Sequence, residues 1–209
     1  RFLRDNGVSD EYVCRHKGTK SHITLAFLNE HNDAQYTFYK DHASAALDGK
    51  LPEISAEDIV LFGSFFAINP IPRPAVSTLL HNARQAGAWL YYDINFRKSH
   101  IPDIPNVLAN IEENMRLADV VRGSKEDFEY LYGLHDPDAI YEKVKPFCNR
   151  FILTDGARSI RIYTPSGCEI FPVQKIETVS TVGAGDNFNA GYIYAKLQGF
   201  DTPSERVQM

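Results

Sequence analysis

The chain has 209 residues, of which 44% are hydrophobic and 23% are charged, so it has enough apolar side chains to form the core of one large domain. Its 22 Lys and Arg against 27 Asp and Glu give a net charge of −5, without the basic excess that is typical of nucleic-acid-binding domains. Its longest apolar runs, such as residues 59–62 and 87–92, are far shorter than the roughly 20 residues that span a bilayer. The composition therefore excludes a mainly disordered chain and argues against a nucleic-acid or membrane partner.

The three cysteines, Cys14, Cys148 and Cys168, are odd in number and widely spaced, and no CxxC pair occurs. This pattern suggests neither a zinc site nor a disulfide framework. Together with a start that does not resemble a signal peptide, it predicts a cytoplasmic protein. The chain opens at Arg1, in sequence that is typical of the middle of a domain, so we expect it to be a segment of a longer protein.

Two β-branched and aromatic runs come first, at residues 22–28 and 35–40. They are separated by the polar, turn-rich residues 29–33, and this pattern predicts a β-hairpin. The hairpin does not fit the pattern of the remaining chain, so we interpret it as an appended β element.

From residue 55 onward, runs with strand composition alternate with runs of helical periodicity, which predicts an α/β domain with a mostly parallel sheet. The expected strands lie at residues 59–62, 89–94, 119–121, 151–154, 159–163 and 169–173. The expected helices lie at residues 74–86, 104–117, 139–147 and from about 183–186 to 197, with a further one that opens at Ser124. Ligands of such sheets bind outside the carboxyl ends of the strands, which directs attention to residues 63–64, 93–97, 122–127, 154–156 and 181–186.

The most informative stretch is residues 181–188, Thr-Val-Gly-Ala-Gly-Asp-Asn-Phe. Two glycines separated by one alanine at a helix start leave the N–H groups of the first turn exposed, where the helix dipole also favours negative charge. A carboxylate beside an anion site is useful if it faces a hydroxyl that attacks phosphorus, and Asp186 stands at that position. The simpler alternative is a glycine-eased helix start with Asp186 as a cap.

Residues 183–186 (Gly-Ala-Gly-Asp) resemble the Asp-Thr-x-Gly-Ala-Gly-Asp signature of the ribokinase-like (phosphofructokinase B type) carbohydrate kinases. Two more motifs occur in the family's order. Residues 93–97 (Asp-Ile-Asn-Phe-Arg) resemble its Asp-x-Asn-x-Arg, and residues 154–156 (Thr-Asp-Gly) resemble its Thr-x-Gly nucleotide turn. The resemblance implies a ribokinase-like three-layer sandwich with a mostly parallel central sheet and a small β-sheet lid. The lid hairpin would be residues 20–42 and the α/β core residues 55–209, without the N-terminal and C-terminal parts of the full domain.

The same resemblance implies a role for each matching residue. Asp186 would accept the proton of the sugar hydroxyl, and the anion hole would come from the amides of Gly183, Ala184 and Gly185. ATP would lie along Thr154 and Gly156. The region of phosphate transfer would include Asn95 and Arg97, although Arg97 has an alternative role as a structural ion-pair partner. The lid would contribute one of Phe38 and Tyr39 to the sugar, since neighbouring residues of a strand point to opposite faces.

The sequence departs from the family pattern at two positions that bear on ions. The first signature Asp is Ser180 here, which leaves a potassium requirement open. The family's Asn-x-x-Glu magnesium motif is represented by Ser124 and Asp127. This pair would lie near the nucleotide, and Asp127 would reach magnesium through water. The pair also has the spacing of a capping box with Asp in place of Glu.

The resemblance implies ATP-dependent phosphorylation of a primary hydroxyl of a small sugar, with fructose or a related ketose or pentose as the first expectation, ATP and Mg²⁺ as cofactors, and a homodimer formed through the lid. The alternatives are a nucleoside or 2-keto-3-deoxygluconate kinase on the same scaffold, and a catalytically silent homologue that binds sugar or nucleotide.

Overall fold

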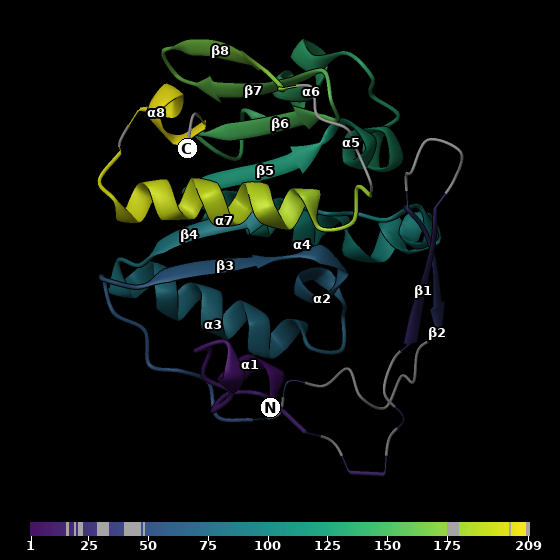
Figure 1. Ribbon diagram of the computed structural model, residues 1–209, viewed down its shortest axis with the longest axis vertical. Helices are drawn as coiled ribbons and strands as arrows, with labels where there is room; N and C mark the ends of the chain where they lie inside the picture. Colours follow the sequence, from purple (N-terminus) through teal and green to yellow (C-terminus); the bar gives the residue numbers. More distant parts are fainter. Residues whose placement is uncertain are drawn as a thin grey trace.

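The computed structural model describes residues 1–209 except 16, 19, 21–22, 29–33, 40–46, 48, 175–179, 201 and 208–209; the side chains of residues 28, 34–36, 38 and 203 also lie outside the description. A six-stranded sheet occupies the centre, with the strands in the order of the sequence (Figure 1). Its strands are β3 (Ile59–Gly63), β4 (Trp89–Asp93), β5 (Val120–Ser124), β6 (Phe151–Asp155), β7 (Ser159–Thr164) and β8 (Gly167–Pro172).

The first four strands of this sheet are parallel, and β7 and β8 continue it as antiparallel strands. This confirms the predicted α/β class. The helices that join or follow the strands are α2 (Ser64–Ile68), α3 (Arg73–Ala86), η2 (Lys98–Asp103, a 3-10 helix), α4 (Ile104–Leu117), α5 (Lys125–Tyr132), α6 (Pro137–Val144), α7 (Ala184–Leu197) and α8 (Pro203–Val207).

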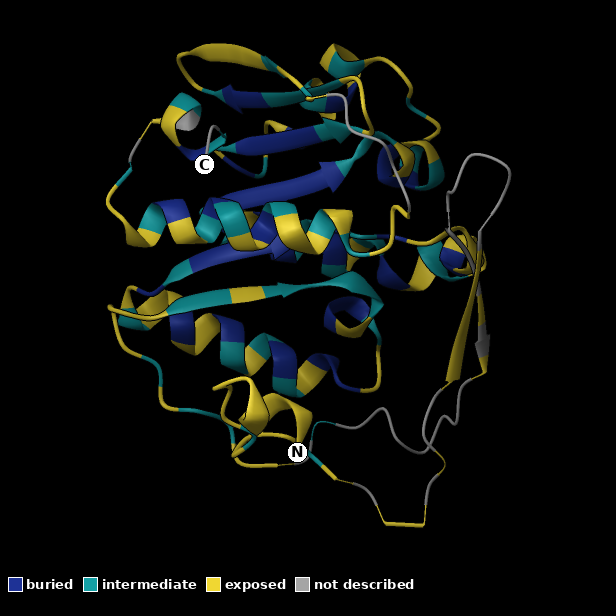
Figure 2. Ribbon diagram, in the orientation of Figure 1, coloured by how far each residue is buried: buried dark blue, intermediate teal, exposed yellow. Residues whose placement is uncertain are grey.

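Helices cover both faces of the sheet, so that the fold has three layers. Tyr91 and Tyr92 are neighbours in β4 and both are 0% exposed, because successive side chains of a strand point to opposite faces and each face is covered. Tyr91 packs with Tyr192 of α7, whereas Tyr92 packs with Ile111 of α4 and Phe128 of α5. Figure 2 shows the resulting pattern, with buried central strands and helices whose outer faces are exposed.

The predicted hairpin is also confirmed. Strands β1 (Ile23–Leu28) and β2 (Ala34–Tyr39) form a separate two-stranded antiparallel sheet in which Ile23 pairs with Tyr39. In Figure 1 this hairpin stands on the side of the molecule toward which the parallel strands point. A short helix, α1 (Phe2–Asp5), precedes it. No helix in the described part of the chain has the length and apolar character to cross a membrane.

Three predicted segments differ from the structure. The helix expected at residues 139–147 is α6, which starts at Pro137 because the Asp136 side chain accepts hydrogen bonds from the N–H groups of Asp138 and Ala139. The strand expected at residues 119–121 is β5, which extends to Ser124. Ser64, expected at the end of a strand, instead opens the short helix α2.

Candidate active site

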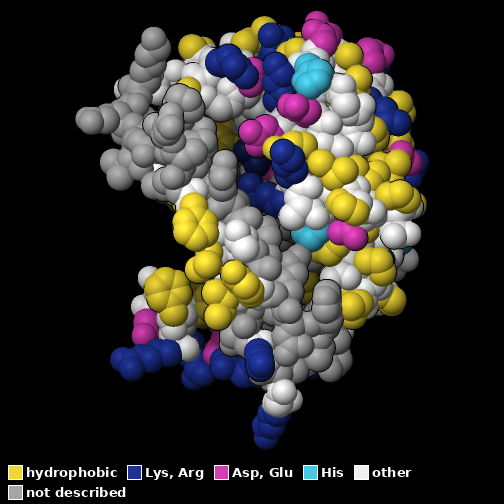
Figure 3. All heavy atoms as spheres, turned by 90° about the vertical axis from the view of Figure 1, so that its right-hand side faces the viewer, with side chains coloured by type: hydrophobic (Ala, Val, Ile, Leu, Met, Phe, Trp, Pro, Cys, Tyr) yellow, Lys and Arg dark blue, Asp and Glu magenta, His cyan; other side chains and the backbone are white. Residues whose placement is uncertain are grey.

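The carboxyl ends of β3, β4, β5 and β6 meet at one edge of the sheet, and α7 begins on the same side (Figure 1). Figure 3 looks onto this side and shows acidic and basic side chains gathered close together, with hydrophobic side chains around them. Three of the sequence motifs, at residues 93–97, 154–156 and 183–186, lie at these strand ends and at this helix start. The sheet therefore brings together segments that are far apart in the sequence.

The first turn of α7 has the form expected from the glycine motif. Gly183 is the residue before the helix and has φ +79°, a left-handed conformation that favours glycine. The Ala184 N–H donates to the Thr181 carbonyl at 3.2 Å. The N–H groups of Gly185 and Asp186 make no hydrogen bond within the part of the chain that the structure describes, and the Asp186 side chain is exposed. This turn therefore offers free donors beside an accessible carboxylate.

Gly185 is required for a different reason, because it packs directly on Arg122 of β5. A Cβ at position 185 would lie 3.1 Å from Nη1 of Arg122, tighter than ordinary van der Waals contact, and 3.4 Å from Nη2. A side chain at position 185 would require the guanidinium group or the helix turn to shift by a few tenths of an ångström.

Arg122 is the centre of a buried polar network below α7. Its Nη1 donates to Asp93 Oδ1 at 3.0 Å, and its Nη2 donates to Thr154 Oγ1 at 2.9 Å. Asn189 of α7 donates to the other oxygen of Asp93 at 2.7 Å, and Tyr91 donates to Asn189 at 3.0 Å. The network therefore joins β4, β5 and β6 to α7.

The electrostatic balance of this network keeps Arg122 charged. Both side chains of its ion pair with Asp93 are about nine-tenths buried. Burial acts to lower the pKa of Arg122, but the negative charges of Asp93 and Asp127 outweigh burial, and the pKa is raised above its ordinary value. A buried pair of this kind is costly to break, since removing one partner leaves the other charge without compensation.

Asp127 holds two of the predicted segments together. Its Oδ2 accepts hydrogen bonds from the N–H and the hydroxyl of Ser124, at 2.5 and 2.8 Å, and its Oδ1 accepts one from the Phe96 N–H at 2.6 Å. The capping box of α5 predicted from Ser124 and Asp127 is thereby confirmed. Since both oxygens are occupied and the residue is 2% exposed, this carboxylate does not fit a direct metal ligand.

The pKa of Asp127 gives a prediction about stability. Burial raises it from its ordinary value of 3.8 to about 6, against the bonds from Ser124, which lower it. The folded protein therefore holds this proton more tightly than the unfolded chain does. The stability that protonation contributes is present below pH 3.8 and is lost as the pH rises through 6.

We expect a rise from pH 5 to pH 7 to reduce the free energy of unfolding by about 1 kcal/mol through this group. Urea unfolding of the natural protein and of Asp127→Asn at the two pH values measures it. The change should be smaller in the variant, and an identical change in both proteins would contradict the prediction.

Two residues that follow β3 and β4 have a left-handed backbone conformation: Ser64 has φ +54° and Asn95 has φ +41°. Asn95 Nδ2 donates to Ser64 Oγ at 2.8 Å. Between them the backbones come so close that a Cβ at Gly63 would lie 2.0 Å from the Asp93 carbonyl oxygen. Non-glycine residues in this region store strain, which is common at functional sites.

The other residues predicted for the site make fewer contacts with the network around Arg122. Thr154 is partly buried and accepts a hydrogen bond from Arg122. Gly156 lies in the exposed turn after β6 with φ +52°. Arg97 is exposed where η2 begins. Tyr39 is 58% exposed on the hairpin, and the side chain of Phe38 lies outside the described residues.

Sequence reasoning pointed to the segments that contain Ser64 and Arg122 without giving Arg122 a role or foreseeing the contacts of either residue, and it missed Asn189. Arg122 has a detectable signal, because a charged residue inside an otherwise apolar strand is expected to be paired. Asn189 also has a signal in the sequence, since it follows Asp186 by three positions, and residues three apart are neighbours on the surface of a helix. The conformation of Ser64 has no signal in the sequence.

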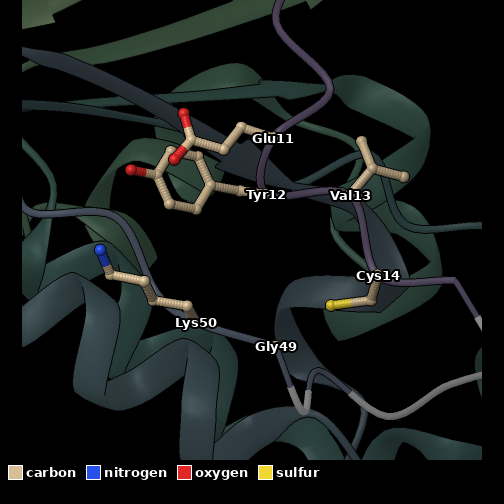
Figure 4. Close-up of a pocket in the computed structure, with 6 residues that line it drawn as sticks. All are labelled: Glu11, Tyr12, Val13, Cys14, Gly49 and Lys50. Atoms are coloured by element: carbon tan, nitrogen blue, oxygen red, sulfur yellow. The ribbon is translucent and has the colours of Figure 1, made fainter.

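A separate small pocket lies on the N-terminal segment, lined by Glu11, Tyr12, Val13, Cys14, Gly49 and Lys50 (Figure 4). A Cβ at Gly49 would lie 2.9 Å from Cys14 Sγ, so this contact seats the N-terminal segment on the segment that precedes β3. None of these residues lies at the carboxyl ends of the parallel strands. Within the described residues, no three His, Cys, Asp or Glu side chains form a group suited to a metal ion.

A three-layer α/β domain with an antiparallel excursion at one edge and a separate hairpin is the ribokinase-like fold. The sequence pattern of the pfkB family of carbohydrate kinases matches residues 1–204. The chain belongs to this family.

Individual relatives agree with this assignment. The chain is 27% identical over 193 residues to Fructokinase-1 of Oryza sativa subsp. japonica, covering 90% of this chain and 60% of the relative. It is 30% identical over 177 residues to a fructokinase of Rhizobium leguminosarum bv. trifolii, covering 81% and 53%. The chain thus spans little more than half the length of these relatives.

Solved structures show the same fold. A fructokinase of Vibrio cholerae O395 in its fructose, ADP and calcium ion bound form superposes with a TM-score of 0.87 at 20% identity, covering 99% of this chain and 69% of the other. Aminoimidazole riboside kinase of Salmonella enterica gives a TM-score of 0.79 at 20% identity, covering 99% and 68%.

Proposed function

We propose that the protein to which this chain belongs transfers the γ-phosphoryl group of ATP to a primary hydroxyl of a small sugar. The observation that carries the proposal is the first turn of α7, where the exposed Asp186 carboxylate stands next to N–H groups that have no partner among the described residues. Phosphoryl transfer needs these two elements, an acceptor for the hydroxyl proton and donors for the developing negative charge.

In this mechanism Asp186 accepts the proton of the attacking hydroxyl. A carboxylate can do this, because in a loose phosphoryl-transfer transition state the proton leaves late. The N–H groups of Gly183 and Gly185 would hold the phosphoryl oxygens. The Ala184 N–H would join them by exchanging its bond to Thr181 for one to the phosphoryl group.

ATP would lie along the turn that contains Thr154 and Gly156, at the end of β6. Magnesium would neutralise the phosphate charge, bound by phosphate and water, with Asp127 acting through water at most because its oxygens already accept three hydrogen bonds. Asn95 and Arg97 would line the phosphate-transfer region from the end of β4. The requirement for potassium stays open, since Ser180 stands in place of the family's Asp.

Fructose is the sugar that we propose first. The relatives reported above are named fructokinases, and one structural neighbour holds fructose. The neighbour named for aminoimidazole riboside is the reason to test a riboside as well. One of Phe38 and Tyr39 would cover the bound sugar from the hairpin.

We propose also that two copies associate through the hairpin. One face carries the apolar side chains of Ile23, Leu25 and Phe27, which are 41–59% exposed, and Tyr39 lies opposite Ile23 on the same face. An exposed apolar two-stranded sheet is an aggregation hazard unless another surface covers it.

A cytoplasmic location stays a prediction.

The test is a coupled ADP-release assay of the whole protein with ATP and Mg²⁺ against fructose, other ketoses, pentoses, ribosides and 2-keto-3-deoxygluconate, with and without potassium. Turnover with fructose supports the proposal. Turnover only with a riboside or with the keto acid would show that the protein is one of the alternative kinases and not a fructokinase. ATP binding without turnover on any acceptor would replace the enzyme by a silent binding homologue.

A further inference from the structure

The two glycines before Asp186 are needed for different physical reasons. Gly183 has a backbone conformation, φ +79°, that disfavours any side chain, and a Cβ there would meet no atom within 4 Å. Gly185 lies within the helix and has no left-handed backbone, but a Cβ added at this position would lie 3.1 Å from Nη1 of Arg122. The first turn of α7 therefore rests on the guanidinium group at position 185.

Arg122 is itself held from several sides. Asp93 and Thr154 bind its two terminal nitrogens, and Asp93 is bound in turn by Asn189, which lies on α7 one turn beyond Gly185. The helix is thus attached to this network at two points, by contact at Gly185 and by a hydrogen bond at Asn189. Asp186 lies between these two points, so its position depends on both.

A guanidinium group below a helix N-terminus is electrostatically unfavourable by itself, because the positive end of the helix dipole repels it. Asp93 compensates this positive charge, Thr154 accepts a hydrogen bond from Nη2, and Asn189 holds Asp93 in place. A planar fork that binds two partners while its edge faces the helix suits arginine and does not suit lysine. The arrangement therefore places a rigid cationic support under the turn that carries the free N–H groups.

We propose that Arg122 is a positioning residue for phosphoryl transfer. Through its contact with Gly185 it fixes the distance between the first turn of α7 and the end of β5. This inference rests on the proposed function. It assigns Arg122 no contact with substrate, since the residue is only 9% exposed beneath α7 and its terminal nitrogens bind Asp93 and Thr154.

The test is a double-mutant cycle in the whole protein, with Arg122→Lys and Gly185→Ala. In the natural background, Gly185→Ala pushes the turn away from the guanidinium group, and we expect kcat to fall about tenfold or more with KM for ATP changed less than about threefold. In the Arg122→Lys background, the same alanine meets no fork, so we expect a further loss in kcat of no more than about twofold.

Gly183→Ala is the matched control. Its cost comes from backbone conformation alone, so it should lower kcat by the same factor in both backgrounds. Equal factors for Gly185→Ala in the two backgrounds would overturn the proposal, and so would a rise in KM for ATP that accounts for the whole loss. Circular dichroism establishes that each variant is folded. Where Arg122→Lys does not fold, the uncharged pair Asp93→Asn with Arg122→Gln takes its place as the background.

The cycle remains informative if the proposed function fails. If no acceptor gives turnover, the thermal unfolding midpoints of the natural protein, the two single variants and the double variant are compared instead. There the contact predicts that Gly185→Ala lowers the midpoint in the natural background and has a smaller effect beside Arg122→Lys. Equal shifts would overturn the contact independently of the enzyme.

Discussion

Asp186→Asn is expected to lower kcat of the whole protein about 1,000-fold, because the variant keeps the shape of the side chain but cannot accept the hydroxyl proton. KM for ATP should stay within about threefold, since Asp186 follows the N–H donors of α7 and is not itself one of the predicted ATP-contacting side chains. The measurement is steady-state kinetics with the sugar that the panel identifies, together with ATP binding in the absence of sugar.

The control for this prediction is Glu57→Gln, which removes an exposed carboxylate from the turn that precedes β3, outside the strand-end site. It should leave kcat unchanged. Full activity of Asp186→Asn would show that another group accepts the proton, and the mechanism proposed above would then be wrong.

Asp127→Ala is expected to give a large loss of stability for a single substitution at this edge of the sheet. The N–H groups of Phe96 and Ser124 and the Ser124 hydroxyl all donate to this carboxylate, and its removal leaves them without an acceptor. We expect the free energy of unfolding at pH 7 to fall by about 3 kcal/mol, measured by urea denaturation.

Asp136→Ala is the comparison that separates burial from capping. Asp136 also accepts two hydrogen bonds at a helix start, but it is exposed, so its removal should cost about 1 kcal/mol. If the two substitutions cost the same, the bond from Phe96 and the buried position of Asp127 contribute nothing beyond an ordinary cap.

The course of the chain through the sheet could be predicted well from the sequence, because apolar periodicity, proline and glycine mark the ends of the elements. The helix predicted at residues 104–117 is α4, with the same bounds. The helix predicted at residues 74–86 is α3, with Gly87 at φ +82° just beyond it. Errors arise where a side chain decides a boundary, as Asp136 does for α6.

The candidate site could be located from the sequence only in part. Motifs with glycines and Asp186 identify the strand ends and the helix start, because these residue types have few other uses in that order. The contact between Arg122 and Gly185 depends on how the helix lies over the strands, and 63 positions separate the two residues. That these two residues lie close together in space follows from how α7 packs on the sheet, and no pattern in the local sequence indicates it.

The network below α7 also has a consequence for the order in which the protein forms. Asn189 binds Asp93 across 96 positions and Tyr91 across 98, whereas each parallel strand pairs with its successor along the chain. During synthesis the strands emerge first, and Asp93 and Arg122 stay open to water until the later helix arrives to cover them. The candidate site is therefore incomplete until α7 has emerged, and a nascent chain that stalls before residue 184 would expose the apolar sheet face around Tyr91 to chaperones.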